Sequence, residues 1–140
     1  MAVLLDLETY GNDAPTVNRG HALNPRRVQF LNARVVSDTN SSGIGPDGVY
    51  RDPWKNPYII SIDLNGDGKC RDSFYRRTIV SKQSNAGPHV GLFNLYDPTS
   101  SGDNFEYDSK IMIWSAGPDG MIELGPGNAG ANKDNVLSWK

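Results

Sequence analysis

The sequence predicts an α+β fold, in which the end of an N-terminal helix packs on a small antiparallel β-sheet with long loops. Three observations support this prediction. Apolar residues recur at helical spacing near the start, β-branched runs of strand length follow later, and Gly (15) and Pro (9) are plentiful while only 37% of the residues are apolar. A chain of 140 residues is long enough for one modest core. We therefore expect a single globular domain over residues 1–140.

The first predicted element is helical and covers residues 1–12, where Gly11-Asn12 is a typical helix stop. No capping residue precedes the apolar positions, which indicates the last turns of a longer helix. A second, short helix is predicted over residues 24–31, with Asn24 as the N-cap and Pro25 in the first turn.

The next segment, 45–58, is predicted to contain a turn and a rigid corner. Gly45–Gly48 has the Pro, Asp and Gly of a tight turn. In Asp52–Tyr58 two prolines restrict the backbone, and Trp54 between them is expected to be a packed corner residue.

Strands are predicted where β-branched and apolar residues form short runs. Tyr58–Asp63 and Phe74–Ser81 should pair as a hairpin across an acidic glycine loop, and Lys110–Ser115 should form a third strand. Met121–Glu123 is a possible short strand, and Val136–Trp139 should pack back on the domain.

Composition argues against several classes of protein. The formal net charge is −2, and no run of Lys and Arg is present, so we expect no nucleic-acid partner. The only cysteine is Cys70, which rules out an internal disulfide. His21 and His89 are far apart in the sequence, and no nucleophile elbow or phosphate loop is present, so we predict no enzyme activity, no catalytic residues and no organic cofactor.

Asp63–Gly68 resembles the first half of a calcium-binding loop, with oxygen donors at Asp63, Asn65 and Asp67. The closing glutamate is absent, because Phe74 holds its position, and Asp72 is the nearest substitute. The alternative is a hairpin turn in which these side chains bond the local backbone.

The C-terminal loop is the stronger metal candidate. Asp119 follows the strand that ends at Ser115, and Asn132 and Asp134 follow a glycine-rich return. Carboxylates together with loop carbonyls are ligands that calcium prefers. The alternative is a solvated loop without a metal.

These motifs together resemble the major pseudopilins of type II secretion. Residues 52–58 are similar to the family signature Asp-Pro-Trp-Gly-Asn-Pro-Tyr, although Lys55 replaces its glycine, which argues against a positive φ there. Residues 115–120 resemble the family's Ser-Leu-Gly-Ala-Asp-Gly, and residues 134–139 resemble its acidic run before a terminal Trp. The loops over 63–72 and 82–104 are longer than is typical of the family.

The resemblance implies a structural role. A subunit of this kind builds a type II secretion pseudopilus or a type IV pilus-like filament, with other copies of itself and minor pseudopilins as partners. An N-terminal helix anchors it in the bacterial inner membrane, and the globular domain lies in the periplasm. The resemblance also implies calcium at the C-terminal loop. This chain would then be the soluble C-terminal part of such a subunit, monomeric by itself. The alternative is an exported calcium-dependent binding module with a ligand site on the loop 82–104.

Overall fold

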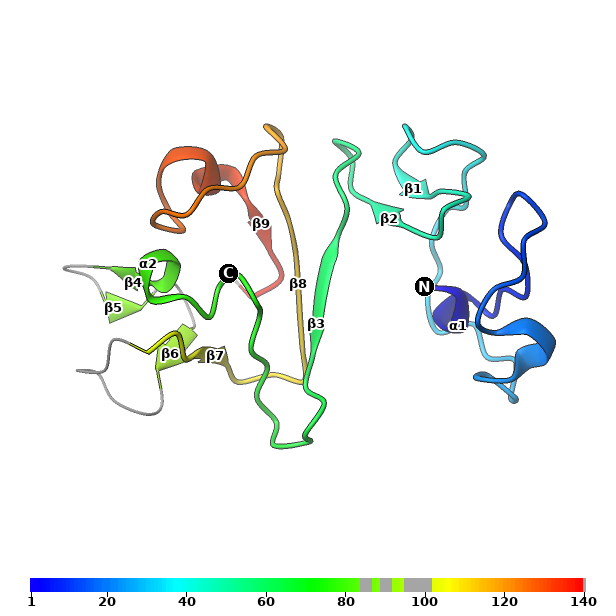
Figure 1. The fold of residues 1–140 in the computed structure, drawn as a ribbon, viewed down its shortest axis with the longest axis horizontal. Coiled ribbons are helices and arrows are strands. Elements are labelled where there is room, and N and C mark those ends of the chain that lie inside the picture. The colour runs from blue at the N-terminus through cyan, green and yellow to red at the C-terminus, as the bar shows by residue number, and fades with distance from the viewer. Residues whose placement is uncertain (84–86, 89–91, 95–101, 140) are drawn as a thin grey trace. The chain divides into compact units, whose positions relative to one another are not determined.

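The computed structural model describes residues 1–83, 87–88, 92–94 and 102–139 (Figure 1). These residues form two compact units, Met1–Tyr58 and Ile59–Lys140. Within them, short helices accompany four small antiparallel sheets, which confirms the α+β class. No helix in the described ranges is long and apolar enough to cross a membrane.

The first unit contains little regular structure. Its elements are the helix α1 (Ala2–Leu5), the 3-10 helix η1 (Arg19–His21) and the paired strands β1 (Gly43–Ile44) and β2 (Tyr50–Arg51). The expected turn joins these strands, because Gly48 has φ +73° and donates its N–H to the carbonyl of Gly45 at 2.9 Å.

Both helix predictions in this unit need correction. The helix expected over 1–12 covers only Ala2–Leu5, because Asp6 takes a left-handed φ of 55° and the chain then forms an isolated bridge between Thr9 and Pro15. Within residues 24–31 only Pro25 and Arg26 form a turn, and the residues after them have no regular secondary structure. The Asn24 side chain binds the carbonyl of Val28 and accepts its N–H, and these bonds hold the turn in place of a helix.

The two-proline corner also departs from expectation. Trp54 is 45% exposed, so it is not the packed residue that the sequence predicts. The corner is instead organised by Asp52, whose buried carboxylate accepts the N–H of Asn56 at 2.8 Å. Lys55 has φ +78°, so it takes the glycine-like conformation without being glycine.

The second unit is built on a three-stranded antiparallel sheet with the order β3-β8-β9 (Figure 1). β3 (Ile59–Ile62) pairs along its whole length with β8 (Ile111–Ser115), and β9 (Val136–Leu137) pairs on the other side. The remaining strands form two further pairs: β4 (Lys82–Gln83) with β5 (Gly87–Pro88), and β6 (Leu92–Asn94) with β7 (Phe105–Tyr107).

The predicted hairpin between residues 58–63 and 74–81 is wrong. Residues 73–77 are turns, and Thr78–Ser81 forms the helix α2. The cause is Asp72, whose carboxylate accepts the N–H groups of Phe74 and Tyr75 at 2.9 Å and turns the chain at once. Residues 121–123 are exposed and form no strand.

The core of the second unit lies on the inner face of this sheet. Tyr75 lies edge-on to Trp114 and Trp139, with ring centroids 5.1 and 5.2 Å apart. Trp139 is only 6% exposed, which confirms that the segment 136–139 packs back on the domain. The buried cluster consists of Cys70, Tyr75, Val80, Leu92, Phe105, Met112, Trp114, Leu137 and Trp139.

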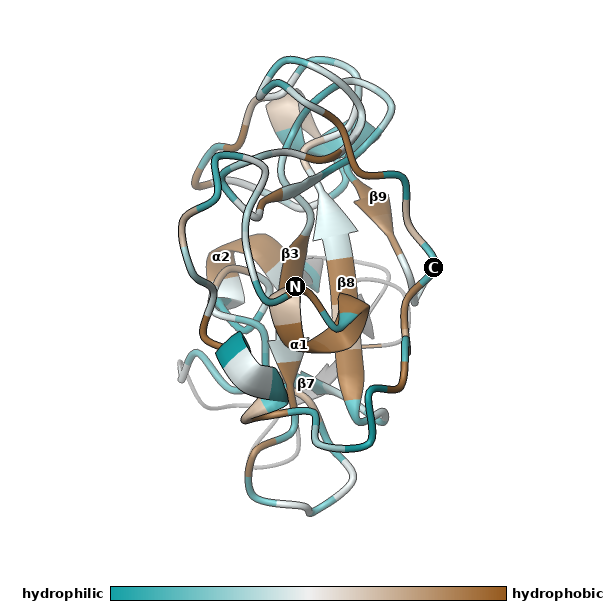
Figure 2. Ribbon diagram, turned by 90° about the vertical axis from the view of Figure 1, so that its right-hand side faces the viewer, coloured by the Kyte–Doolittle hydropathy of each residue, from teal (hydrophilic) through white to brown (hydrophobic). Residues whose placement is uncertain are grey.

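The outer face of the same sheet is aliphatic. Side chains alternate along a strand, so the residues between the core positions share this second face. In β8 the buried Met112 and Trp114 alternate with Ile111 and Ile113. The exposed fractions of Ile62, Ile111 and Val136 are 58%, 44% and 46%. Figure 2 shows the apolar colour along these strands. The five members of this aliphatic face are Ile60, Ile62, Ile111, Ile113 and Val136.

Candidate functional site

The C-terminal loop, residues 115–135, brings two of the four proposed metal ligands together. The N–H of Asp119 donates to Asp134 Oδ2 at 3.2 Å, and Asp119 Oδ1 accepts the N–H of Met121 at 2.8 Å. Ser115 is buried at the end of β8, and its hydroxyl accepts the N–H of Gly117 at 3.4 Å. The Asp134 carboxylate therefore lies against the turn that carries Asp119.

Gly117 allows the two arms of the loop to approach closely. It has φ +65°, and a Cβ there would lie 2.1 Å from the carbonyl oxygen of Asp134. Any larger residue would push the arm carrying Asp134 away. The contact is made by the main chain, so it fixes the position of Asp134 relative to the turn that carries Asp119.

Asn132 has a different role from the one that the sequence suggested. It is 1% exposed, and its amide binds the opposite arm of the loop. Its Oδ1 accepts the N–H of Glu123, and its Nδ2 donates to the carbonyls of Glu123 and Gly125 at 2.9 and 3.2 Å. Both ends of the amide are thus used to hold the loop, so Asn132 is a brace and not a metal ligand.

Glu123 is a member of this loop that sequence reasoning missed. Its carboxylate accepts the N–H of Ala131 at 3.0 Å, and its main chain is bound by Asn132. One sequence signal could have suggested Glu123. It is an acidic residue that directly precedes a glycine-rich segment with almost no apolar side chains to fix its shape. Glu123 therefore organises the arm that Asn132 braces.

Two buried side-chain oxygens of the loop, Asp134 Oδ1 and Asn135 Oδ1, have no hydrogen-bond partner among the described residues, and the carboxylate oxygen is the better fit for a bound cation. A buried carboxylate oxygen without a partner is costly, and a hard cation would satisfy it. The described residues contain no group of three or more His, Cys, Asp or Glu side chains placed to hold a metal, so most other ligands would have to be main-chain oxygens or water.

The acidic loop 63–68 uses its oxygens differently. Asp63 accepts the N–H groups of Gly66 and Gly68 through its two oxygens, both at 2.8 Å. Asp67 accepts from Asn65 Nδ2 and from the N–H of Lys69. The hydrogen bond from Asn65 is the main reason that the pKa of Asp67 is lowered. This arrangement corresponds to the alternative interpretation, a turn closed by its own side chains.

Asp72 does not join that loop. Its side chain is fully buried, and its Oδ2 accepts bonds from Ser61 Oγ at 2.7 Å and Trp114 Nε1 at 3.1 Å. It therefore stabilises the core next to the sheet. The acidic loop instead borders an open hollow, in which Arg71 forms an ion pair with Glu106.

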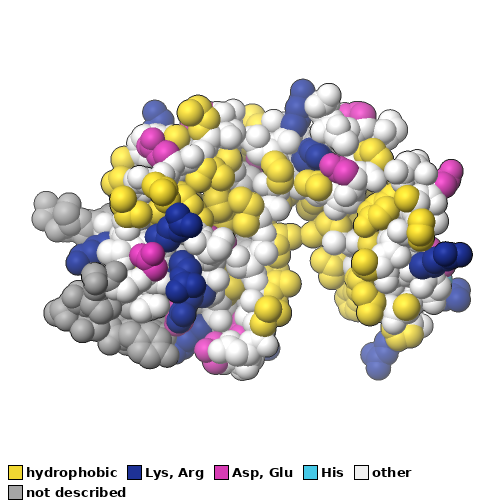
Figure 3. Space-filling model, in the orientation of Figure 1, with side chains coloured by type: hydrophobic (Ala, Val, Ile, Leu, Met, Phe, Trp, Pro, Cys, Tyr) yellow, Lys and Arg dark blue, Asp and Glu magenta, His cyan; other side chains and the backbone are white. Residues whose placement is uncertain are grey.

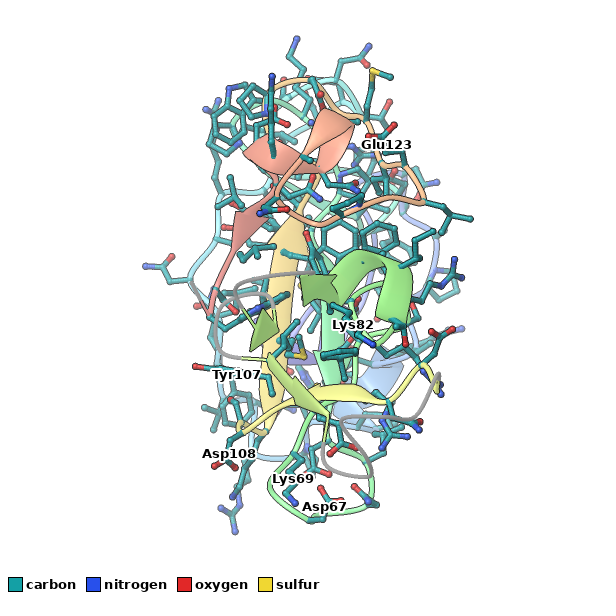
Figure 4. The ribbon with its side chains drawn as sticks, turned by 90° about the vertical axis from the view of Figure 1, so that its left-hand side faces the viewer. Asp67, Lys69, Lys82, Tyr107, Asp108 and Glu123 are labelled. Atoms are coloured by element: carbon teal, nitrogen blue, oxygen red, sulfur yellow. The ribbon has the colours of Figure 1, made fainter. Side chains whose placement is uncertain are left out.

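The acidic loop 63–68 and the C-terminal loop lie at opposite ends of the β3-β8-β9 sheet. Figure 4 shows Asp67 and Lys69 at one end of the second unit and Glu123 at the other, in agreement with the course of the chain in Figure 1. They are therefore separate sites.

Three further observations concern the cysteine, the charged side chains and the suggested ligand site on the loop 82–104. Cys70 is a buried member of the core cluster, and this burial raises the pKa of its thiol. On the face shown in Figure 3, acidic and basic side chains are interspersed. The suggested ligand site on the loop 82–104 lies largely outside the described residues.

No protein-family model, curated protein or solved structure matches this chain.

Proposed function

We propose that the chain is a structural subunit of a type II secretion pseudopilus or of a type IV pilus-like filament. The three pseudopilin-like motifs, in family order, support the class. The protein would be held in the bacterial inner membrane by an apolar N-terminal helix, with these residues in the periplasm. Its partners would be other copies of itself and minor pseudopilins.

The observation that carries this proposal is the aliphatic face of the β3-β8-β9 sheet. Five Ile and Val side chains share it, and three of them are 44–58% exposed. Contiguous apolar surfaces of this kind mark interaction sites, because burying them stabilises a complex by about 25 cal/mol per Å². An apolar helix laid along the strands would cover this face, which is the role that a pilin-like helix has in a filament.

The test replaces Ile111 with Asp in the source bacterium. The side chain is 44% exposed, so the globular part should still fold. We expect at least a tenfold loss of the protein from sheared filaments. The matched control is Leu64→Asp, because Leu64 is 93% exposed and lies outside the aliphatic face. Equal filament yield from the wild type and Ile111→Asp, with normal folding by circular dichroism, would refute the proposal.

We also propose that calcium holds the C-terminal loop. Asp134 would bind the calcium ion through its buried Oδ1, and Asp119 would bind it through its carboxylate. The hydroxyl oxygen of Ser115 would be a further ligand. The bound cation would supply positive charge to offset the carboxylates of Asp119 and Asp134. Two residues shape the loop around the proposed site. Gly117 permits the close approach of its two arms, and Asn132 holds the segment that carries Asp134 against the opposite arm.

A thermal-shift experiment tests the metal. Binding to the folded state alone stabilises a protein by RT ln(1 + [L]/Kd), about 2.7 kcal/mol at a hundredfold excess over Kd. We expect calcium to raise Tm, chelator to reverse the rise, and Asp119→Ala or Asp134→Ala to abolish it. Asp63→Ala should preserve the rise, because the Asp63 oxygens bind local N–H groups. A rise lost in Asp63→Ala but kept in Asp134→Ala would assign the metal to the other loop.

A further inference from the structure

Asn65-Gly66 is the only Asn-Gly pair in the chain, and it lies in the acidic loop 63–68, at the end of the second unit that Asp67 marks in Figure 4. Both residues are exposed. Gly66 has φ +73°, and a Cβ built on it would meet nothing within 4 Å. Because glycine has no side chain, its main-chain nitrogen can approach the side-chain carbonyl carbon of the preceding asparagine without obstruction.

Other asparagines of the chain lack one of these features. Asn24 and Asn56 precede proline, which has no N–H and so offers no nitrogen for such an approach. Asn132 is 1% exposed, and both ends of its amide are hydrogen-bonded. Asn40 is exposed, but the residue after it is serine, whose side chain hinders the approach. Asn65 is therefore the asparagine whose side chain can react with its own main chain against the least obstruction.

The reaction in question is a deamidation that needs only water. The nitrogen of Gly66 loses its proton and bonds to Cγ of Asn65, which closes a succinimide ring. The bond from Cγ to Nδ2 breaks, and Nδ2 takes up a proton and leaves as ammonia. Water then opens the ring at either carbonyl and leaves aspartate or isoaspartate at position 65. No oxidant or reductant takes part, because no carbon changes its oxidation state.

The loop holds both reacting groups in hydrogen bonds that oppose this reaction. The N–H of Gly66 donates to Asp63 Oδ1 at 2.8 Å. This carboxylate puts negative charge beside the nitrogen, which disfavours the loss of its proton. Asn65 Nδ2 donates to Asp67 Oδ2 at 2.8 Å, and this bond must be given up before the amide leaves. Deamidation therefore requires the loop to open first.

We propose that Asn65 is a site of spontaneous deamidation, and that Asp63 and Asp67 slow the reaction by holding the attacking nitrogen and the leaving amide. Opening of the acidic loop then sets the rate. Conversion replaces the donor of Asn65 with a carboxylate beside that of Asp67, so a hydrogen bond becomes a repulsion between like charges. The converted loop is more open than the original. This inference does not depend on the filament role.

Peptide mass spectrometry of the whole chain, incubated at neutral pH with and without urea, tests the proposal. In urea both hydrogen bonds are absent, so Asn65 should convert from amide to acid before any other asparagine does. In the folded chain the rate at Asn65 should be at least threefold lower than in urea. Another asparagine that converts ahead of Asn65 in urea, or a rate at Asn65 that folding does not lower, would overturn the proposal.

Variants identify the hydrogen bonds that slow the reaction. Asp63→Ala frees the N–H of Gly66, and Asp67→Ala removes the acceptor of the side-chain amide. Each should raise the rate at Asn65 in the folded chain at least twofold. The matched control is Asp38→Ala, which removes another carboxylate that accepts a loop N–H but lies in the other unit, and it should leave this rate unchanged. Rates equal to that of the wild type in both loop variants would refute the proposed restraint.

Discussion

Replacing Asp72 with Asn changes one atom at the centre of the second unit. Each oxygen of the carboxylate accepts two hydrogen bonds. Oδ2 binds Ser61 Oγ and Trp114 Nε1, and Oδ1 binds the N–H groups of Phe74 and Tyr75. An asparagine has an NH2 group in place of one oxygen. In the Oδ1 position the NH2 group faces two main-chain N–H groups; in the Oδ2 position it faces the Trp114 N–H and the Ser61 hydroxyl, which can turn to accept.

The expected cost follows from these contacts. At least one hydrogen bond to a charged acceptor is lost, worth roughly 1.5–3 kcal/mol, and a buried Trp114 N–H or main-chain N–H is left unpaired at a cost of about 1–3 kcal/mol. The neutral amide is less costly to bury than a carboxylate, which offsets part of this loss. We therefore expect the free energy of unfolding to fall by about 3 kcal/mol, a large part of the roughly 5–15 kcal/mol typical of a domain.

Urea unfolding followed by tryptophan fluorescence measures this change. With a slope of about 2 kcal/mol per molar urea, the midpoint should fall by about 1.5 M. The matched control is Asp63→Asn, because Asp63 also accepts two N–H groups but does so in the acidic loop, away from the core. Its cost should stay below about 1 kcal/mol. Equal costs for the two variants would refute the argument that burial makes Asp72 decisive.

Three further predictions follow from single contacts. Trp54→Ala should change stability by less than about 1 kcal/mol, measured by thermal melting, because the ring is 45% exposed. The hydrogen bond from Arg51 lowers the pKa of Asp47 to about 2, so Arg51→Met should return that pKa towards 3.8 in a carbon-detected titration. An unchanged pKa of Asp47 in this variant would show that the ion pair does not form in solution. Burial raises the pKa of Tyr75 to about 12, so an ultraviolet titration should show one tyrosine ionising near that pH; since the unfolded chain loses this proton near pH 10, stability should fall as pH rises from 10 to 12.

Local patterns predicted some elements of the fold well. The β-branched run at Ile59–Ile62 and the apolar run at Ile111–Ser115 are both strands. Their pairing with each other was not predicted, because no local pattern reports which distant strand a run will meet. Tyr75 was assigned to a strand for its neighbours' β-propensity, whereas the hydrogen bonds from Asp72 turn the chain there.

The candidate sites were predicted unevenly. Sequence spacing placed Asp119 and Asp134 in one candidate site, and in the structure the N–H of Asp119 donates to Asp134 Oδ2. It gave the wrong role to Asn132, since an amide can brace a loop as readily as it can bind a metal. No sequence pattern predicted the ion pair of His21 with Glu8, because this contact depends on the left-handed backbone of Asp6 at the end of α1.

The central position of β8 sets the order in which this chain can fold. Its two partners come from far apart in the sequence, with β3 well before it and β9 after it. The third strand and the core residue Trp139 are supplied only by the last residues of the chain. Such non-local pairing slows folding and leaves apolar strands unprotected during synthesis. We therefore expect a chain shortened before Val136 to aggregate as it is synthesised, even though most of its residues would be present.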